Sequence, residues 1–84
     1  MNDTQETPLY RFKDNVGYVL ANLPNGPSII EVGNAHFIIA GLDYHPDNLQ
    51  PTHVGQIASG PHDGTFWFLE PGWLEKITDW ATPV

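Results

Sequence analysis

Residues 28–40 read Ser-Ile-Ile-Glu-Val-Gly-Asn-Ala-His-Phe-Ile-Ile-Ala, and this stretch decides the class of fold. Two runs rich in β-branched and aromatic residues, 28–32 and 35–40, flank the pair Gly33-Asn34. Such runs favour β-strands, and a Gly-Asn pair between them is typical of a two-residue hairpin turn. The stretch therefore predicts a β-hairpin.

The register of this predicted hairpin follows from the turn. It places Glu31 opposite His36 and Ile30 opposite Phe37. We interpret the Glu31–His36 pair as a cross-strand ion pair rather than as an acid–base pair for catalysis. Alternation along the two strands then gives one apolar face, which we expect to face the core: Ile30, Val32, Phe37 and Ile39.

The rest of the chain shows the same alternation of short apolar segments and turns, because eight glycines and eight prolines separate these segments. Further strands are predicted at 17–23, 53–59 and 65–69, with turns at 24–27 and 60–64 and a loop at 42–51. Ring-bearing side chains on both faces of the 65–69 strand indicate a central position in the sheet. The pattern predicts a mainly β (α+β) fold, a small barrel or curled sheet of four to five antiparallel strands.

One short C-terminal helix is predicted from Pro71 to about Trp80, since proline is favoured at the first helical position. Apolar residues recur there at helical spacing and form a stripe: Trp73, Leu74, Ile77 and Trp80. Charged residues take the outer face: Glu75, Lys76 and Asp79. We expect this helix to cover one end or face of the sheet.

Length and charge limit the function. The 84 residues carry ten carboxylates and three basic side chains, for a net charge of −7, and no cysteine. We expect one β-rich domain at 10–84 after a polar, mobile tail at 1–9, with a core too thin for a walled active site. Such a charge repels nucleic acid and anionic membranes and attracts basic protein surfaces. The start of the chain has no signal-peptide pattern, so we expect a cytoplasmic protein that is not an enzyme and needs no cofactor.

Two segments resemble known proteins. The strand at 17–23 with the Asn-Gly turn after it, and the segment 66–77, Phe-Trp-Phe-Leu-Glu-Pro-Gly-Trp-Leu-Glu-Lys-Ile, are similar to small SH3-like barrel proteins of phages and bacteria. The resemblance implies an SH3-like barrel. The chain lacks the basic loops of nucleic-acid-binding SH3-like domains, and in size, charge and absence of cysteine it is similar to phage-encoded inhibitors of host defence.

The leading functional hypothesis is a small acidic, non-enzymatic module that inhibits or modulates a larger protein with a basic surface. Carboxylates would steer the encounter, and exposed aromatic rings would anchor it by contact with Arg or Lys. The candidate partner-binding residues are Asp43, Tyr44, Asp47, Asp63, Glu70, Glu75, Asp79 and Trp80. For Trp80, the sequence leaves open whether the ring seals the core or presents an adhesive face.

Two alternative functions are also compatible with the sequence. The residues Asp43, His45, Asp47 and His53 cluster in sequence, with His62 and Asp63 in a second loop. Imidazole and carboxylate are ligands for divalent metals, so these loops form a candidate metal or small-ligand site, although turn chemistry explains the same residues. The second alternative is an assembly protein that forms a homo-oligomer through exposed strand edges.

Overall fold

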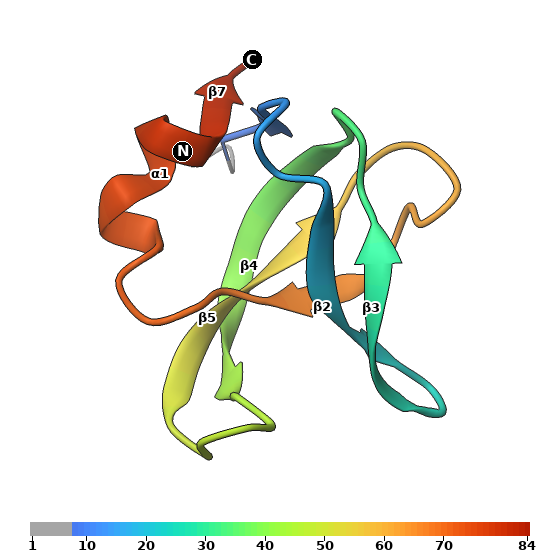
Figure 1. The fold of residues 1–84 in the computed structure, drawn as a ribbon, viewed down its shortest axis with the longest axis vertical. Coiled ribbons are helices and arrows are strands. Elements are labelled where there is room, and N and C mark those ends of the chain that lie inside the picture. Colours follow the sequence, from blue (N-terminus) through green and yellow to red (C-terminus); the bar gives the residue numbers. More distant parts are fainter. Residues whose placement is uncertain (1–7) are drawn as a thin grey trace, which may run out of the picture.

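In a computed structural model, residues 8–84, the part of the chain that the structure describes, form one antiparallel sheet of seven strands. The elements are β1 (Tyr10–Phe12), β2 (Tyr18–Leu23), β3 (Gly26–Glu31), β4 (His36–Tyr44), β5 (Pro51–Ile57), β6 (Phe66–Phe68), the 3-10 turn η1 (Leu74–Lys76), α1 (Ile77–Trp80) and β7 (Ala81–Pro83). The strand order is β3-β2-β6-β5-β4-β1-β7. Figure 1 shows α1 and β7 at one end of the curled sheet and the β4–β5 loop at the other.

The predicted mainly β fold with one short C-terminal helix is confirmed, but the barrel and the strand count are wrong. The end strands β3 and β7 do not pair, so the sheet is curled and not closed. The two extra strands are β1 and β7, of three residues each. They pair with each other, and β1 also joins β4 through Tyr10 and Arg11. Strands this short carry too little alternation to be recognised from sequence.

The hairpin predicted at 28–40 is also wrong in its pairing. The turn exists, because Ala35 donates its N–H to the Val32 carbonyl at 2.8 Å and Asn34 has a positive φ of 65°. Beyond the turn the strands separate: β3 pairs with β2, and β4 pairs with β5 and β1. The face was predicted correctly, since Ile30, Val32 and Phe37 are buried and Ile39 packs against them.

The hairpin that does form joins β2 and β3, as Leu23 pairs with Gly26 around the turn at Pro24-Asn25. The strand predicted at 17–23 is confirmed, whereas two residues of the predicted turn, Gly26 and Pro27, belong to β3. Gly26 has a φ of 116°, which favours glycine. Since β3 is the last strand of the sheet, Pro27 sits where a missing backbone donor is tolerated.

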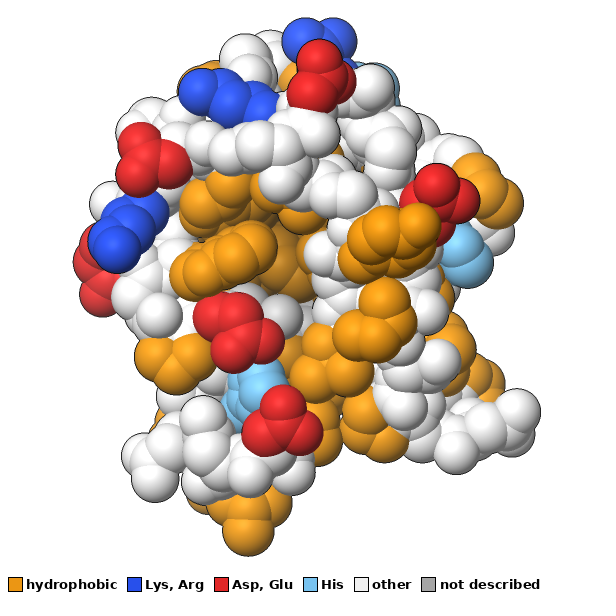
Figure 2. Space-filling model, in the orientation of Figure 1, with side chains coloured by type: hydrophobic (Ala, Val, Ile, Leu, Met, Phe, Trp, Pro, Cys, Tyr) orange, Lys and Arg blue, Asp and Glu red, His pale blue; other side chains and the backbone are white. Residues whose placement is uncertain are grey.

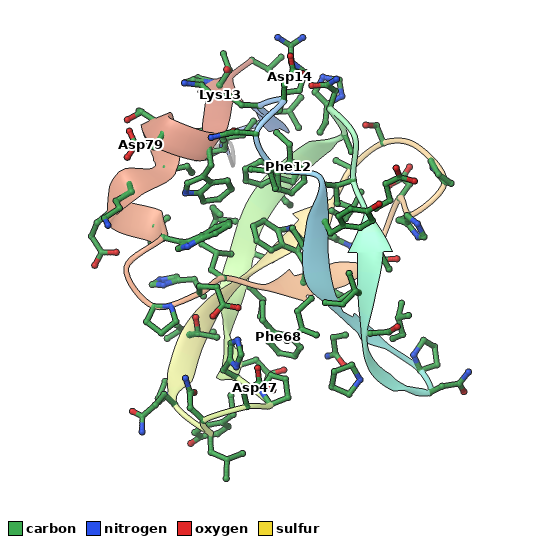
Figure 3. The ribbon with its side chains drawn as sticks, in the orientation of Figure 1. Phe12, Lys13, Asp14, Asp47, Phe68 and Asp79 are labelled. Carbon is green, nitrogen blue, oxygen red and sulfur yellow. The ribbon has the colours of Figure 1, made fainter. Side chains whose placement is uncertain are left out.

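The core is an aromatic cluster built around β6, which is central as predicted. Trp67 packs against Phe12, Phe37 and Trp80 with ring centroids 5.2–5.7 Å apart. Figure 3 shows Phe12 among these rings in the middle of the molecule. Aromatic pairs at these distances contribute about 0.5–1.5 kcal/mol each beyond the burial of their area.

The C-terminal helix is shorter than predicted. Residues 71–73 form turns, followed by η1 and only four α-helical residues, Ile77–Trp80. The predicted faces are correct: Trp73, Leu74 and Ile77 pack against the core, and the charged residues are exposed. Helix α1 ends at Trp80, and β7 begins at the next residue, Ala81.

The predicted loop at 42–51 is also shorter, because β4 continues to Tyr44 and β5 begins at Pro51. The strand predicted at 53–59 corresponds to β5, and the turn predicted at 60–64 is present. The predicted tail at 1–9 lies outside the described residues except for Pro8 and Leu9. The Leu9 carbonyl accepts the Val84 N–H at 2.9 Å. Within residues 8–84, the helices are too short to cross a bilayer.

Candidate functional site

An aromatic hollow of about 240 Å³ lies between the β2–β3 hairpin and the turn that precedes η1. We call it the aromatic groove, and it is lined by Tyr18, Val19, Leu20, Ile29, Trp67, Phe68, Glu70 and Trp73. Strand alternation exposes Tyr18 and Ile29, while Trp67 and Phe68 form its floor from β6. Figure 2 shows hydrophobic side chains gathered on this face with acidic side chains beside them. The groove therefore offers ring faces and one carboxylate to a ligand.

The carboxylate of the groove, Glu70, belongs to a small polar network. Its Oε2 atom lies 3.2 Å from Nε2 of His45, and Nδ1 of the same ring lies 3.1 Å from the backbone N of Asp47. The Glu70 side chain remains 49% exposed although His45 is 1% exposed. The buried imidazole thus bonds the Glu70 carboxylate and the backbone N–H of Asp47, and so connects two different loops at one end of the molecule.

Hydrogen bonding fixes how His45 is oriented. Because Nδ1 accepts the N–H of Asp47, the proton of the neutral ring is on Nε2 and is donated to Glu70. The ring packs against Phe68 with centroids 5.8 Å apart, and the backbone of His45 bonds to Gln50 and Leu49. His45 is therefore the anchor of the β4–β5 loop.

The metal alternative gains no support from the geometry. Among residues 8–84, no group of three His, Asp or Glu side chains is arranged to hold a metal ion. Both nitrogen atoms of His45 already take part in hydrogen bonds. His53 is exposed on β5, and His62 lies in the 60–64 turn.

The predicted contact between His36 and Glu31 is wrong, because their strands do not pair. Nδ1 of His36 lies 3.1 Å from Oγ of Ser59, and the same hydroxyl accepts the backbone N–H of His36 at 2.8 Å. This pair fastens the end of β5 to the start of β4. It is a structural contact between the two segments.

The structure places the predicted binding residues in several different regions. Asp43 and Tyr44 are exposed at the end of β4. Asp63 is exposed in the 60–64 turn, whereas Glu75 and Asp79 lie on the outer side of η1 and α1. Figure 3 shows Asp47 and Asp79 at different ends of the molecule. Of the predicted residues from different segments, the structure links Asp47 and Glu70 through His45, and Glu70 and Glu75 line one hollow.

Trp80 does not belong to the partner-binding surface that the sequence predicts, because it is buried. It is 5% exposed, its Nε1 donates to the Trp73 carbonyl at 2.9 Å, and its ring stacks on Phe37 at 5.4 Å. Of the two roles that the sequence allows for Trp80, the structure supports the one in which the ring covers the core. Trp80 is therefore unavailable as an anchor for a partner.

The basic side chains avoid the aromatic groove. Arg11 and Lys13 line a different hollow with Asn34 and Thr82, and Lys13 donates to the Thr78 carbonyl at 2.7 Å. Figure 2 shows the blue side chains at the top and left of the molecule. The lining of the aromatic groove therefore contains one carboxylate, Glu70, and no basic side chain.

Sequence reasoning missed several exposed apolar residues: Tyr18, Ile29, Leu42, Leu49 and Phe66. Tyr18 and Ile29 read as ordinary strand residues, and only the position of the β2–β3 hairpin at the end of the sheet exposes them. The link between His45 and Glu70 also spans 25 positions and has no sequence signal.

Comparison with protein-family models, with curated proteins and with solved structures found no match to this chain. The resemblance to SH3-like proteins and to phage inhibitors therefore stays a prediction.

Proposed function

We propose that this protein is a small, acidic, non-enzymatic binding module that docks onto a basic surface of a larger protein and thereby inhibits or modulates it. The observation that carries this proposal is the half-exposed carboxylate of Glu70 in a groove lined by aromatic rings. An Arg or Lys of the partner would contact the rings of Tyr18 and Trp73 and pair with Glu70.

Rigid placement of the acidic groups supports this function. The Glu70 carboxylate is positioned by the buried imidazole of His45, so it loses little side-chain freedom when a partner binds, and the same ring bonds the backbone N–H of Asp47. The net charge of −7 would speed the encounter with a basic protein, and this attraction weakens with added salt.

The test is capture of a partner by the tagged chain, followed by measurement of its affinity at several salt concentrations. The double variant Glu70→Gln, Asp47→Asn should bind roughly tenfold or more weakly, because a hydrogen bond to a charged group contributes about 1.5–3 kcal/mol.

The control is Asp14→Asn, Asp79→Asn, which removes the same charge at the other end of the molecule (Figure 3). This control should bind as the wild type does, apart from a small change in association rate. Equal loss in both double variants would mean that net charge alone matters, and absence of any partner would contradict the proposal.

A further inference from the structure

Strand β4 has one edge that is paired over only part of its length. On one side it pairs with β5 from Phe37 to Tyr44. On the other side, within residues 8–84, only β1 pairs with it, through His36 and Phe37. Every residue from Ala40 to Tyr44 is exposed. We call this segment the open β4 edge.

This edge lacks two of the usual protections against pairing, proline and lysine, although it has a register shift at Ile39/Gly41 and the charged residue Asp43. Edge strands are commonly blunted by proline or lysine, or by being very short. The end strands of the sheet follow this rule, since β3 contains Pro27 and the three-residue β7 contains Pro83. The open β4 edge contains neither proline nor lysine. Its register shifts between Ile39 and Gly41, and pairing with β5 is regular from Gly41 to Tyr44.

The side chains of this edge are unusually apolar. Leu42 is 67% exposed, and Tyr44 is equally open. The next residue after Leu42 is Asp43, whose side chain points to the opposite face of the strand. The backbone N–H of Tyr44 donates to Oδ1 of Asp43 at 2.7 Å, which closes the edge at this end.

A hollow of about 260 Å³ adjoins the edge and is lined by Leu42, Asp43, Tyr44 and Pro51. A second hollow, of about 330 Å³, lies over the sheet face from β4 across Val54 of β5 and Phe66 of β6 to Asn22 of β2, on the paired side of β4. Recognition by strand addition needs free main-chain groups for affinity and hollows for alternate side chains for specificity. The open β4 edge supplies both.

We propose that the open β4 edge takes up an extended segment of the partner protein as an additional strand of the sheet. This inference rests on the proposed function and names how the partner is held. The segment would place apolar side chains against Leu42 and a Lys or Arg near Asp43. The charge of this chain favours such a basic segment over a second copy, which also carries −7.

The probe is a random dodecapeptide library displayed on phage and selected on the purified chain. The enriched peptides are then synthesised, and their affinity is measured for the wild type and for two variants. The substituted positions of the two variants are similarly exposed, and each substitution changes the charge by the same amount. Leu42→Lys alters the open β4 edge, and Val84→Lys, at a position 71% exposed, lies outside both this edge and the aromatic groove. We expect peptides with alternating apolar and basic residues that lose at least tenfold affinity with Leu42→Lys and less than twofold with Val84→Lys.

Amide hydrogen exchange of the peptide complex gives a second readout, with slower exchange expected at residues 40–43. Three results would overturn the inference: no enriched peptide, peptides whose affinity falls as much with Val84→Lys as with Leu42→Lys, or a wild-type dimer that Leu42→Lys dissociates. A captured partner that binds both Lys variants equally would also overturn it, while the proposed function would stand. Failure to capture any partner would instead count against the proposed function.

Discussion

Gly55 of β5 lies directly beneath the indole of Trp67 of β6, so closely that a Cβ atom on the glycine would meet Nε1 of the tryptophan at 2.5 Å. The two residues are paired across the central strands, and both are buried. Real Cβ atoms do not come this close to a neighbour, and the indole is confined by Phe12, Phe37 and Trp80. The absence of a side chain at position 55 therefore allows the aromatic core to close.

Gly55→Ala should consequently destabilise the fold by about 1–3 kcal/mol, which is the usual cost of overpacking a core. The control is Gly41→Ala in the neighbouring strand β4, where a Cβ would meet nothing within 4 Å. Urea unfolding followed by tryptophan fluorescence measures both. Equal stability of the two variants would show that Trp67 moves aside without cost.

Trp80 should be among the most important residues for stability, although it lies close to the C-terminus. Trp80→Ala removes a buried ring and its hydrogen bond to the Trp73 carbonyl, so we expect a loss of about 3–5 kcal/mol. Tyr44→Ala, which removes an exposed ring, should change the stability by less than about 0.5 kcal/mol. Thermal unfolding distinguishes the two, and a mild effect of Trp80→Ala would contradict the role of this ring as a seal.

The hairpin region shows which parts of the fold the sequence predicts. Alternation of apolar and polar residues identified the buried face, because that pattern depends only on the strand itself. It did not identify the neighbouring strand: Phe37 pairs with Ile57 of β5 and Tyr10 of β1, not with Ile30. Pairing depends on contacts between distant segments, and a Gly-Asn turn fits a hairpin as well as a turn after which the strands separate.

The candidate site was predictable only in part, for the same reason. The sequence predicts both Glu70 and Asp47 as candidate partner-binding residues, because carboxylates outnumber basic side chains in the chain. The buried ring of His45 that joins them was read as a loop residue, because nothing local marks a histidine as buried. Both roles of Trp80 are compatible with the sequence, since its position on the helical stripe does not tell how deep the helix lies.

His45 gives a third prediction, because it is buried and holds the β4–β5 loop. His45→Ala should cost about 2–3 kcal/mol through the lost packing against Phe68 and the lost hydrogen bond to the Asp47 N–H. His53→Ala, an exposed histidine on β5, should be nearly neutral. Urea unfolding gives the stabilities, and amide exchange should show faster opening of residues 45–50 in His45→Ala alone. Unchanged exchange in that loop would contradict the anchoring role.

Within residues 8–84, two non-glycine residues have positive φ, and they give opposite predictions. Asn34 has a φ of 65° and Leu49 a φ of 56°. The left-handed region costs an ordinary residue about 1–2 kcal/mol, whereas asparagine adopts it readily. Leu49 is 72% exposed, so its side chain gains little from burial in return. Leu49→Asn should therefore stabilise the protein by about 0.5–1 kcal/mol, and Asn34→Leu should destabilise it by a similar or larger amount. Equilibrium unfolding in urea measures the two changes on one scale, and a destabilising Leu49→Asn would show that the leucine side chain contributes to the fold despite its exposure.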